Sequence, residues 1–175
     1  MRNMKKTIST VLLACLSTFY GCAHRERIDN TPVQNFSLQK YLGTWYEIGR
    51  LNHPFERHLS HVSAEYKMMP GGKVRVTNSG LKGNEYKKTV GKAFQPHPEK
   101  REGRLRVSFF GPFYSDYRVL TISPDYRYAL IGSKSSGYLW IMSRTPAMPS
   151  DVLSDIVSDA ESRGYDLDKL IWVEQ

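Results

Sequence analysis

The feature that most constrains the fold is a series of eight short runs rich in β-branched and aromatic residues, spaced about ten residues apart. Turn-forming residues separate the runs, for example Pro-Gly-Gly at 70–72, Gly-Pro at 111–112 and Pro-Asp at 124–125. The runs read TWYEIGRL, HVSAEYKMM, KVRVTNS, EYKKTVGKAF, RLRVSFF, YRVLTI, YRYALIGS and YLWIMSR. Short connections of this kind join antiparallel neighbours, so the pattern predicts an all-β meander.

Apolar and polar residues alternate within these runs. Val74 and Val76 occupy alternate positions of one run, and Leu105, Val107 and Phe109 occupy those of another. This period of two is typical of strands with one buried face. A sheet of eight strands has two exposed edges unless it closes on itself. We therefore expect an eight-stranded antiparallel up-and-down β-barrel.

One later segment has helical periodicity instead. In SDVLSDIVSDAESRG, the apolar residues between 152 and 160 recur on one helical face. Ser150 is expected at the N-cap and Gly164 directly after the last turn. We expect one C-terminal α-helix packed on the outside of the barrel. Residues 36–42 are expected to form one helical turn before the first strand, and residues 169–175 could add a short ninth strand.

The N-terminus has the features of an export signal, because Arg2, Lys5 and Lys6 precede a run of apolar and small residues. Cys22 follows that run in a pattern that resembles a bacterial lipoprotein signal, which is cut before a cysteine that becomes lipid-modified. Cys15 is the competing candidate, because LLAC fits the usual pattern better, although it leaves a shorter apolar run. The chain has 2 cysteines, both in this region, which excludes a disulfide or a cysteine nucleophile in the folded part.

These features divide the chain into a signal peptide (1–21), a lipid anchor with a polar tether (22–35) and a folded domain (36–175). We expect Cys22 to attach the protein to the bacterial outer membrane, on its periplasmic face. Ala23 after the cysteine favours that membrane by analogy with lipoprotein sorting in Gram-negative bacteria. A soluble exported protein with an incidental Cys22 is the alternative.

The charge of the chain does not indicate a nucleic-acid partner. The net charge is +8 for the whole chain, and without residues 1–21 it falls to about +5, because Lys+Arg drops from 25 to 22 while Asp+Glu stays at 17. The basic residues are scattered rather than gathered into one arm. Weak attraction to anionic lipid head groups suits this excess better.

Three motifs, in order, resemble those of the lipocalin family, and in particular its bacterial lipoprotein and apolipoprotein D branches. GTWYE at 43–47 matches the family's Gly-x-Trp-Tyr-Glu signature, and Asp116-Tyr117 stands where the second motif falls. Arg144 in IMSRTP matches the arginine of the third motif, and the similarity continues over almost the whole chain from Phe36. The resemblance implies a barrel that holds an apolar ligand, with no catalytic group and no cofactor.

The resemblance also implies that Trp45 seals one end of the barrel and that Arg144 packs on its ring. A cation–π contact of this kind stabilises by about 0.5–2 kcal/mol. Gly43 would allow the close approach of the chain at this end. We therefore interpret Trp45 as a structural plug, which places the function at the opposite, open end.

The resemblance further implies that the cavity binds a fatty acid or a lysophospholipid, to store or transport it. Each buried methylene contributes about 0.8 kcal/mol, so an acyl chain needs no catalytic group to bind. By strand parity, the candidate ligand-binding residues are Tyr66, Val76, Asn78, Val107, Phe109 and Trp140. Asn78 could instead be a turn residue before Gly80. A single β-bulge would reverse a whole row of these assignments.

Two other classes of function remain open: a lipid hydrolase and a structural envelope protein that binds nothing. The chain has no Gly-x-Ser-x-Gly motif, and we interpret GSKSSG at 132–137 as a hairpin loop. His53, His58 and His61 match no metal-ligand spacing and are expected to be solvated in the long first loop over the mouth. The barrel could also form a homodimer.

Overall fold

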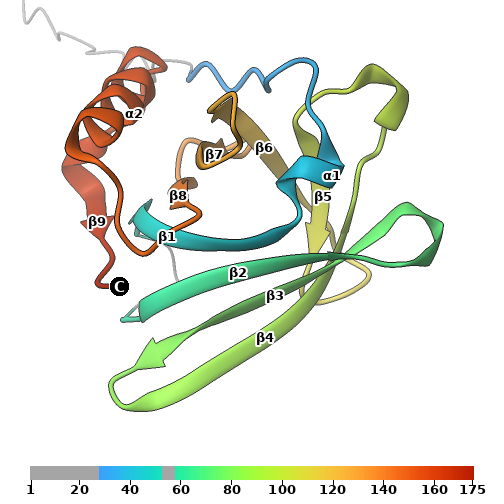
Figure 1. Cartoon of the computed structure of the whole chain (residues 1–175), viewed down its shortest axis with the longest axis horizontal. Helices are drawn as coiled ribbons and strands as arrows, with labels where there is room; N and C mark the ends of the chain where they lie inside the picture. Colours follow the sequence, from blue (N-terminus) through green and yellow to red (C-terminus); the bar gives the residue numbers. More distant parts are fainter. Residues whose placement is uncertain (1–27, 53–57) are drawn as a thin grey trace, which may run out of the picture.

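The computed structural model describes residues 28–52 and 58–175, and Figure 1 shows how the elements are arranged. The expected signal peptide, Cys15, Cys22 and His53 lie outside the described residues. The strands are β1 (Gly43–Leu51), β2 (Ser60–Met68), β3 (Lys73–Lys82), β4 (Glu85–Phe94), β5 (Arg104–Ser108), β6 (Ser115–Ile122), β7 (Tyr128–Gly132), β8 (Leu139–Ser143) and β9 (Leu170–Trp172). The helices are α1 (Leu38–Tyr41) and α2 (Ser150–Ser162), with the short 3-10 turns η2 (Pro70–Gly72), η3 (Pro98–Lys100) and η4 (Leu167–Lys169). No helix in this part of the chain is long and apolar enough to cross a membrane.

The strands form one antiparallel sheet that closes on itself. Their order is β2-β3-β4-β5-β6-β7-β8-β1-β9, and β1 also pairs with β2. This last pairing joins the two ends of the eight-stranded series, and β9 is added beside β1. The predicted eight-stranded barrel and the short ninth strand are both confirmed.

The two ends of the barrel are built differently. The helix α1 and the start of β1 lie at one end, together with the η2 turn and the connection that contains η3 (Figure 1). We call this the closed end. Because successive strands run in opposite directions, the loops β3–β4, β5–β6 and β7–β8 lie at the opposite end. We call that the open end, where the mouth is expected.

β1 changes its partner halfway along its length. Residues 43–46 pair with β2, whereas residues 49–51 pair with β9 on the same edge. Where β2 departs, Gln175 Nε2 donates to the backbone oxygens of Glu47 at 2.6 Å and Val62 at 2.9 Å. The backbone amide of His61 donates to the oxygen of Glu174 at 2.5 Å. The C-terminal residues therefore bridge the two strands at the point where they diverge.

Two separate apolar clusters stabilise the fold. The first lies in the barrel interior and contains buried residues from α1 and from the barrel strands, including Tyr41, Trp45, Tyr66, Val74, Val76, Leu105 and Val107. The second lies between the barrel wall and α2, where Leu120, Leu130, Leu139, Ile141, Ile156 and Ala160 are buried together. Figure 1 shows α2 and β9 beside the barrel, so the prediction of an external helix is confirmed.

The two ends of α2 were predicted with different success. The expected N-cap at Ser150 is wrong, because Ser150 is already helical and Pro149 (φ −56°, ψ 142°) is the N-cap. The Pro149 side chain accepts no capping hydrogen bond, but its backbone oxygen accepts the amide of Leu153 at 2.9 Å. The stop at Gly164 is confirmed by its φ of +84°. The amide of Tyr165 then bonds the oxygen of Ala160 at 3.2 Å, as in a Schellman motif.

Candidate functional site

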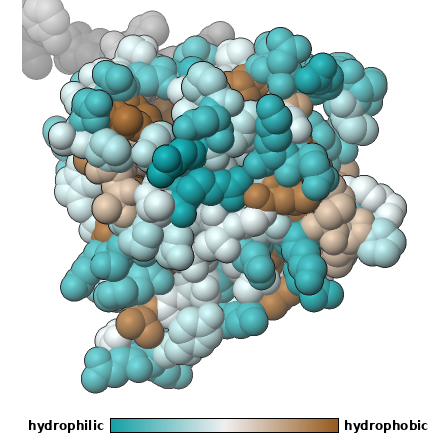
Figure 2. Space-filling model, viewed as in Figure 1, coloured by the Kyte–Doolittle hydropathy of each residue, from teal (hydrophilic) through white to brown (hydrophobic). Residues whose placement is uncertain are grey.

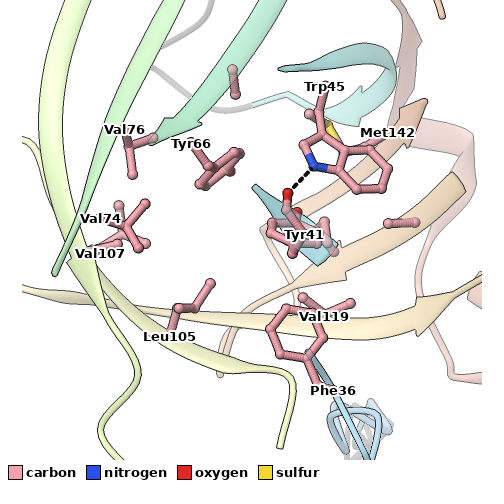
Figure 3. Close-up of a cluster of buried hydrophobic side chains, with 14 residues drawn as sticks. Phe36, Tyr41, Trp45, Tyr66, Val74, Val76, Leu105, Val107, Val119 and Met142 are labelled. Atoms are coloured by element: carbon pink, nitrogen blue, oxygen red, sulfur yellow. Dashed lines mark hydrogen bonds between the residues drawn. The ribbon is translucent and has the colours of Figure 1, made fainter. Parts of the chain in front are cut away.

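Trp45 lies at the closed end of the barrel, which we also call its floor, and is fully buried. Its indole Nε1 donates to the backbone oxygen of Tyr41 at 2.8 Å, and the two rings stack with centroids 4.9 Å apart. Figure 3 shows this pair among side chains that converge from several strands. One contact thus ties the first strand to the helical turn that precedes it.

Arg144 covers the outer side of this tryptophan. Its Cζ is 3.9 Å from the centroid of the Trp45 ring, so the predicted contact is present. The guanidinium donates to the oxygens of Thr44, Lys40, Tyr41 and Tyr126 at 2.9–3.2 Å. Burial lowers the pKa of Arg144 from its usual value, but an arginine still carries its charge. The charge is therefore held by carbonyls that α1 and the β6–β7 loop present.

Gly43 is placed where a side chain would not fit. Its φ is +97°, and a Cβ at this position would lie 3.2 Å from Nη1 of Arg144. The backbone conformation strongly favours glycine here, and a side chain would also crowd the guanidinium of Arg144. Gly43, Trp45 and Arg144 thus form one packed unit, although their role as a plug for a ligand cavity stays a prediction.

Three tyrosine hydroxyls meet just inside this floor. The Tyr117 hydroxyl is 2.6 Å from that of Tyr41 and 2.9 Å from that of Tyr66. Burial raises the pKa of Tyr41 and of Tyr117 well above the usual value, so both stay neutral. Sequence reasoning identified Tyr66 alone as part of the cavity. Tyr117 could have been found, because it stands in the second motif, but nothing in the sequence placed Tyr41 beside it.

Asp116, the neighbour of Tyr117 in that motif, points to the outer surface. Its carboxylate accepts from Arg104 Nε at 3.0 Å and from Arg118 Nε at 2.5 Å. Desolvation alone would raise the pKa of Asp116, but these two hydrogen bonds outweigh it and lower the pKa below the usual value. The motif therefore fixes the start of β6 by an ion pair outside and a tyrosine inside.

All six candidate ligand-binding residues belong to the inner face. Buried Tyr66, Val76 and Val107 are members of the interior cluster, and Phe109 and Trp140 pack against it partly buried. Asn78 shares the face of Val76 and pairs with Ala64 on one side and Thr89 on the other. Because β3 continues to Lys82, the alternative of Asn78 as a turn residue is wrong. Contact of these six side chains with a ligand stays a prediction.

A buried ion pair stands in the same interior, and sequence reasoning missed it. Arg50 Nη1 donates to Glu47 Oε1 at 2.5 Å, and each side chain is about 2–3% exposed. A register shift between Glu47 and Gly49 puts Glu47 opposite Met142 and Arg50 opposite Trp140, whose side chains both belong to the interior cluster or pack on it. Strict alternation from Trp45 would have sent Arg50 outward. The β-bulge is the reason that no pattern in the sequence indicated this pair.

The structure shows no catalytic or metal-binding arrangement at the two segments considered for a hydrolase or a metal site, residues 132–137 and the described histidines near the start of β2. Gly132 ends β7 and residues 133–137 lie in the β7–β8 connection, where Ser133 Oγ donates to the backbone oxygen of Ser135 and accepts from its amide. His58 and His61 are exposed. Among residues 28–52 and 58–175, no three His, Cys, Asp or Glu side chains gather as a metal site would require.

A surface groove of about 460 Å³ lies outside the barrel interior, between elements of the closed end and Tyr114 of the β5–β6 loop. It is lined by Leu38 of α1, by the η2 turn and by Phe94, Pro98 and Tyr114 among others. None of the predicted ligand-binding residues contributes to it. The groove is therefore separate from the candidate site.

Comparisons with known proteins agree with this architecture. The family described as "Lipocalin-like domain" matches residues 36–175. The chain is 42% identical over 147 residues to outer membrane lipoprotein Blc of Citrobacter freundii, covering 83% of this chain and 82% of that protein. It is 39% identical over 167 residues to outer membrane lipoprotein Blc of Vibrio cholerae, covering 94% and 96%.

A solved structure supports the fold independently of sequence. Insecticyanin from the tobacco hornworm Manduca sexta superposes with a TM-score of 0.70 at 23% identity, covering 84% of this chain and 85% of that one. Three observations therefore agree on one family: the closed barrel, the contact of Arg144 with Trp45, and the family match over residues 36–175. The chain belongs to the lipocalin family.

Proposed function

We propose that this protein binds a single-chain anionic lipid, a fatty acid or a lysophospholipid, inside its barrel and stores or transports it in the bacterial cell envelope. The observation that carries the proposal is the composition of the inner face. The inner face carries apolar side chains such as Val76, Val107 and Trp140, and it also holds one buried ion pair, Glu47–Arg50, opposite Met142 and Trp140. The acyl chain of such a lipid would pack on the apolar side chains, and its acidic head group would pair with the guanidinium of Arg50.

The ion pair is the part of the interior that folding alone does not explain. Removing two charges from water costs several kcal/mol per ion, and an apolar pair of the same volume is often as stable. Arg50 Nη2 also donates to the backbone oxygen of Leu59 at 3.2 Å, which holds the guanidinium at the start of β2. A guanidinium held in this way can offer a carboxylate or phosphate charge-assisted hydrogen bonds without reorganising.

The energetics of an acyl chain suit reversible binding. About twelve buried methylenes at about 0.8 kcal/mol each give roughly 10 kcal/mol before association and ordering costs are subtracted. Association costs of at least about 4 kcal/mol leave up to about 6 kcal/mol, which corresponds to a dissociation constant of the order of tens of micromolar before any head-group contact is added. No covalent step is needed for this function, and lipocalins are generally binding proteins rather than enzymes.

The proposed place of action is the periplasmic face of the outer membrane, with Cys22 as the lipid-modified residue. Two relatives are named outer membrane lipoproteins, and Cys22 ends an apolar run that begins after basic residues. Intact-mass spectrometry of the purified protein tests this part by itself. An acylated N-terminal Cys22 supports it, whereas a mass that begins at Cys15 or carries no acyl group contradicts it.

The binding proposal is tested with palmitate, a lysophospholipid and an uncharged monoacylglycerol. We expect all three to bind, and we expect the double variant Glu47→Gln/Arg50→Met to weaken palmitate about 10-fold, because one charge-assisted hydrogen bond of about 1.5 kcal/mol is lost. Monoacylglycerol affinity should stay unchanged. Both charges are removed together so that neither is left buried alone.

The matched control is Asp166→Asn/Lys169→Met, which removes an exposed ion pair outside the barrel. It should leave all three affinities unchanged. If native mass spectrometry finds no co-purified lipid and the wild-type protein binds none of the three, the proposal is wrong and a purely structural role is favoured. Turnover of the lysophospholipid by pure protein would instead favour a hydrolase.

A further inference from the structure

The outer surface beside the open end carries apolar side chains that the interior does not explain. Tyr86 and Val90 of β4 are 63% and 53% exposed, and Phe110 and Phe113 of the β5–β6 loop are 68% and 80% exposed. These four are among the six large hydrophobic side chains that stand exposed within the described part of the chain. We call them the outer apolar patch. On the face in Figure 2, apolar atoms emerge as separate areas among hydrophilic ones.

The β4 members of the patch share the outer face of their strand with lysines. Thr89 and Gly91 pair with the inward positions Asn78 and Val76, so the residues between and beyond them point outward. This outward row alternates aromatic or aliphatic residues with cations and reads Tyr86, Lys88, Val90 and Lys92.

The β5–β6 loop lies directly against this row. A Cβ on Gly111 would stand 3.5 Å from Lys92 Nζ, and the same ammonium is 5.7 Å from the centroid of the Tyr114 ring. Phe110 and Phe113 lie on either side of Gly111-Pro112 in this loop, so their part of the patch adjoins the Lys92 end of the outward row. Only residues 92–94 of β4 pair with β5, and the part of β4 toward Glu85 has β3 as its strand partner in the described chain. The outward row therefore stands clear of β5.

The charge of this region is strongly one-sided. Residues 82–92 contain four lysines and one glutamate, a net charge of 4 − 1 = +3, and that glutamate, Glu85, is paired with Lys87. Residues 109–114 carry no charge. Exposed aromatic side chains beside unpaired cationic surface match the interface of an anionic bilayer, where rings enter the head-group region and lysines meet phosphate.

We propose that the outer apolar patch and its lysines dock the open end of the barrel onto an anionic lipid surface. The docking is separate from the N-terminal anchor and from ligand binding. It would also bring the mouth to the lipid, because Phe109, which packs on the interior cluster, is directly followed in the chain by the exposed Phe110. A lipid could then pass between bilayer and barrel without crossing bulk water.

The test uses the protein produced from the full-length chain and reconstituted on vesicles of phosphatidylcholine, with or without phosphatidylglycerol. A fluorophore that senses polarity is attached to Phe113→Cys and, as the positional control, to Ser154→Cys on the exposed side of α2. The unsubstituted protein, labelled in parallel, gives the background from Cys15 and Cys22. We expect a blue shift at position 113 on anionic vesicles that salt reverses, and none at position 154.

A pair of charge variants tests the electrostatic part. Lys88→Glu/Lys92→Glu should reduce the docked fraction about 10-fold at low salt, whereas Lys73→Glu/Lys100→Glu, two exposed lysines at the closed end, should leave it unchanged. Water-like emission at position 113 on both vesicles, or equal shifts at positions 113 and 154, would overturn the proposal. So would a shift without vesicles that grows with protein concentration, because the patch would then join two copies of the chain. Ligand affinity in detergent-free solution, measured separately, is expected to be the same in both charge variants.

Discussion

At the scale of single residues, the contacts of the floor explain why one tryptophan is needed there. Trp45 is held by a hydrogen bond to Tyr41 on one side and by the guanidinium of Arg144 on the other. Arg144 in turn satisfies carbonyls of α1 and of the β6–β7 loop. Loss of the ring would leave a cavity and would remove the aromatic face on which Arg144 packs, so the effect should reach beyond one contact.

Trp45→Ala should therefore destabilise the whole barrel. Truncating a buried tryptophan costs about 3–5 kcal/mol, a large share of the stability of a domain of this size. Urea unfolding followed by far-ultraviolet circular dichroism measures the change. Trp172→Ala is the control, because Trp172 is 55% exposed and should cost far less. A Trp45→Ala protein as stable as the wild type would show that the ring is not the plug.

A second prediction concerns Asp116 and pH. Its pKa in the folded protein lies below the usual value of 3.8, so its contribution to stability is present above that value and is lost as the pH falls through the folded pKa. Asp116→Asn should lower the free energy of unfolding by about 1–3 kcal/mol at neutral pH, and the difference from wild type should narrow in acid. Thermal unfolding across pH checks this. Asp155→Asn, at an exposed helix position, should change little. A difference that is constant with pH would contradict the ion-pair explanation.

At the scale of elements, β1 organises the barrel because it pairs with more strands than any other strand in the described part of the chain. It pairs with β8 along one edge and with β2 and then β9 along the other. Its bulge after Glu47 rotates the second half of the strand. The same rotation turns Arg50 inward and leaves Gly49 against Trp172. The change of partner creates a seam that the C-terminal residues cover.

Gln175→Ala should loosen this seam without unfolding the barrel. The side chain loses its hydrogen bonds to Glu47 and Val62, each of which contributes about 0.5–1.5 kcal/mol. Amide exchange at His61 should rise about 10-fold, since its amide donates to the neighbouring Glu174. Hydrogen–deuterium exchange read by NMR measures it. Gln34→Ala, which removes a local bond to Pro32, should leave His61 unaffected, and equal exchange in both variants would mean that Gln175 does not hold the seam.

At the scale of the whole molecule, the two apolar clusters lie on opposite sides of the barrel wall, and only the interior one contains candidate ligand-binding residues. The cluster under α2 lies outside the barrel, whereas the other cluster lies in its interior. A ligand that enters from the open end would extend the interior cluster and leave the packing of α2 unchanged. Binding should therefore add to the stability of the existing fold rather than induce it.

Palmitate should raise the melting temperature by mass action. At a free concentration of about 100 times the dissociation constant, the folded state gains about 2.7 kcal/mol, which corresponds to roughly 5–10 °C for a domain of this size. Differential scanning calorimetry at several palmitate concentrations measures the shift. Butyrate, which has the same head group and little chain, is the control. A melting temperature that is insensitive to palmitate would argue against a ligand site in the barrel.

Much of the candidate site could be read from local pattern, and the exceptions have identifiable causes. Alternation placed Tyr66, Val76, Val107 and Trp140 on the inner face, because the strands pair in regular register around those positions. The inward position of Arg50 was not predicted, because the β-bulge depends on how β8 pairs with β1 and leaves no signal in the sequence of β1.

The sequence by itself determined the strands, their turns, the helix with its glycine stop, and the motifs of the floor, because all of these depend on spacing along a few neighbouring residues. Only the tertiary structure decided which segments meet. It brought together Tyr41, Tyr66 and Tyr117, closed the seam with Gln175, and laid the β5–β6 loop against the lysines of β4. The physical reason is that these contacts depend on cross-strand register and barrel closure, which are properties of the assembled sheet rather than of any one strand.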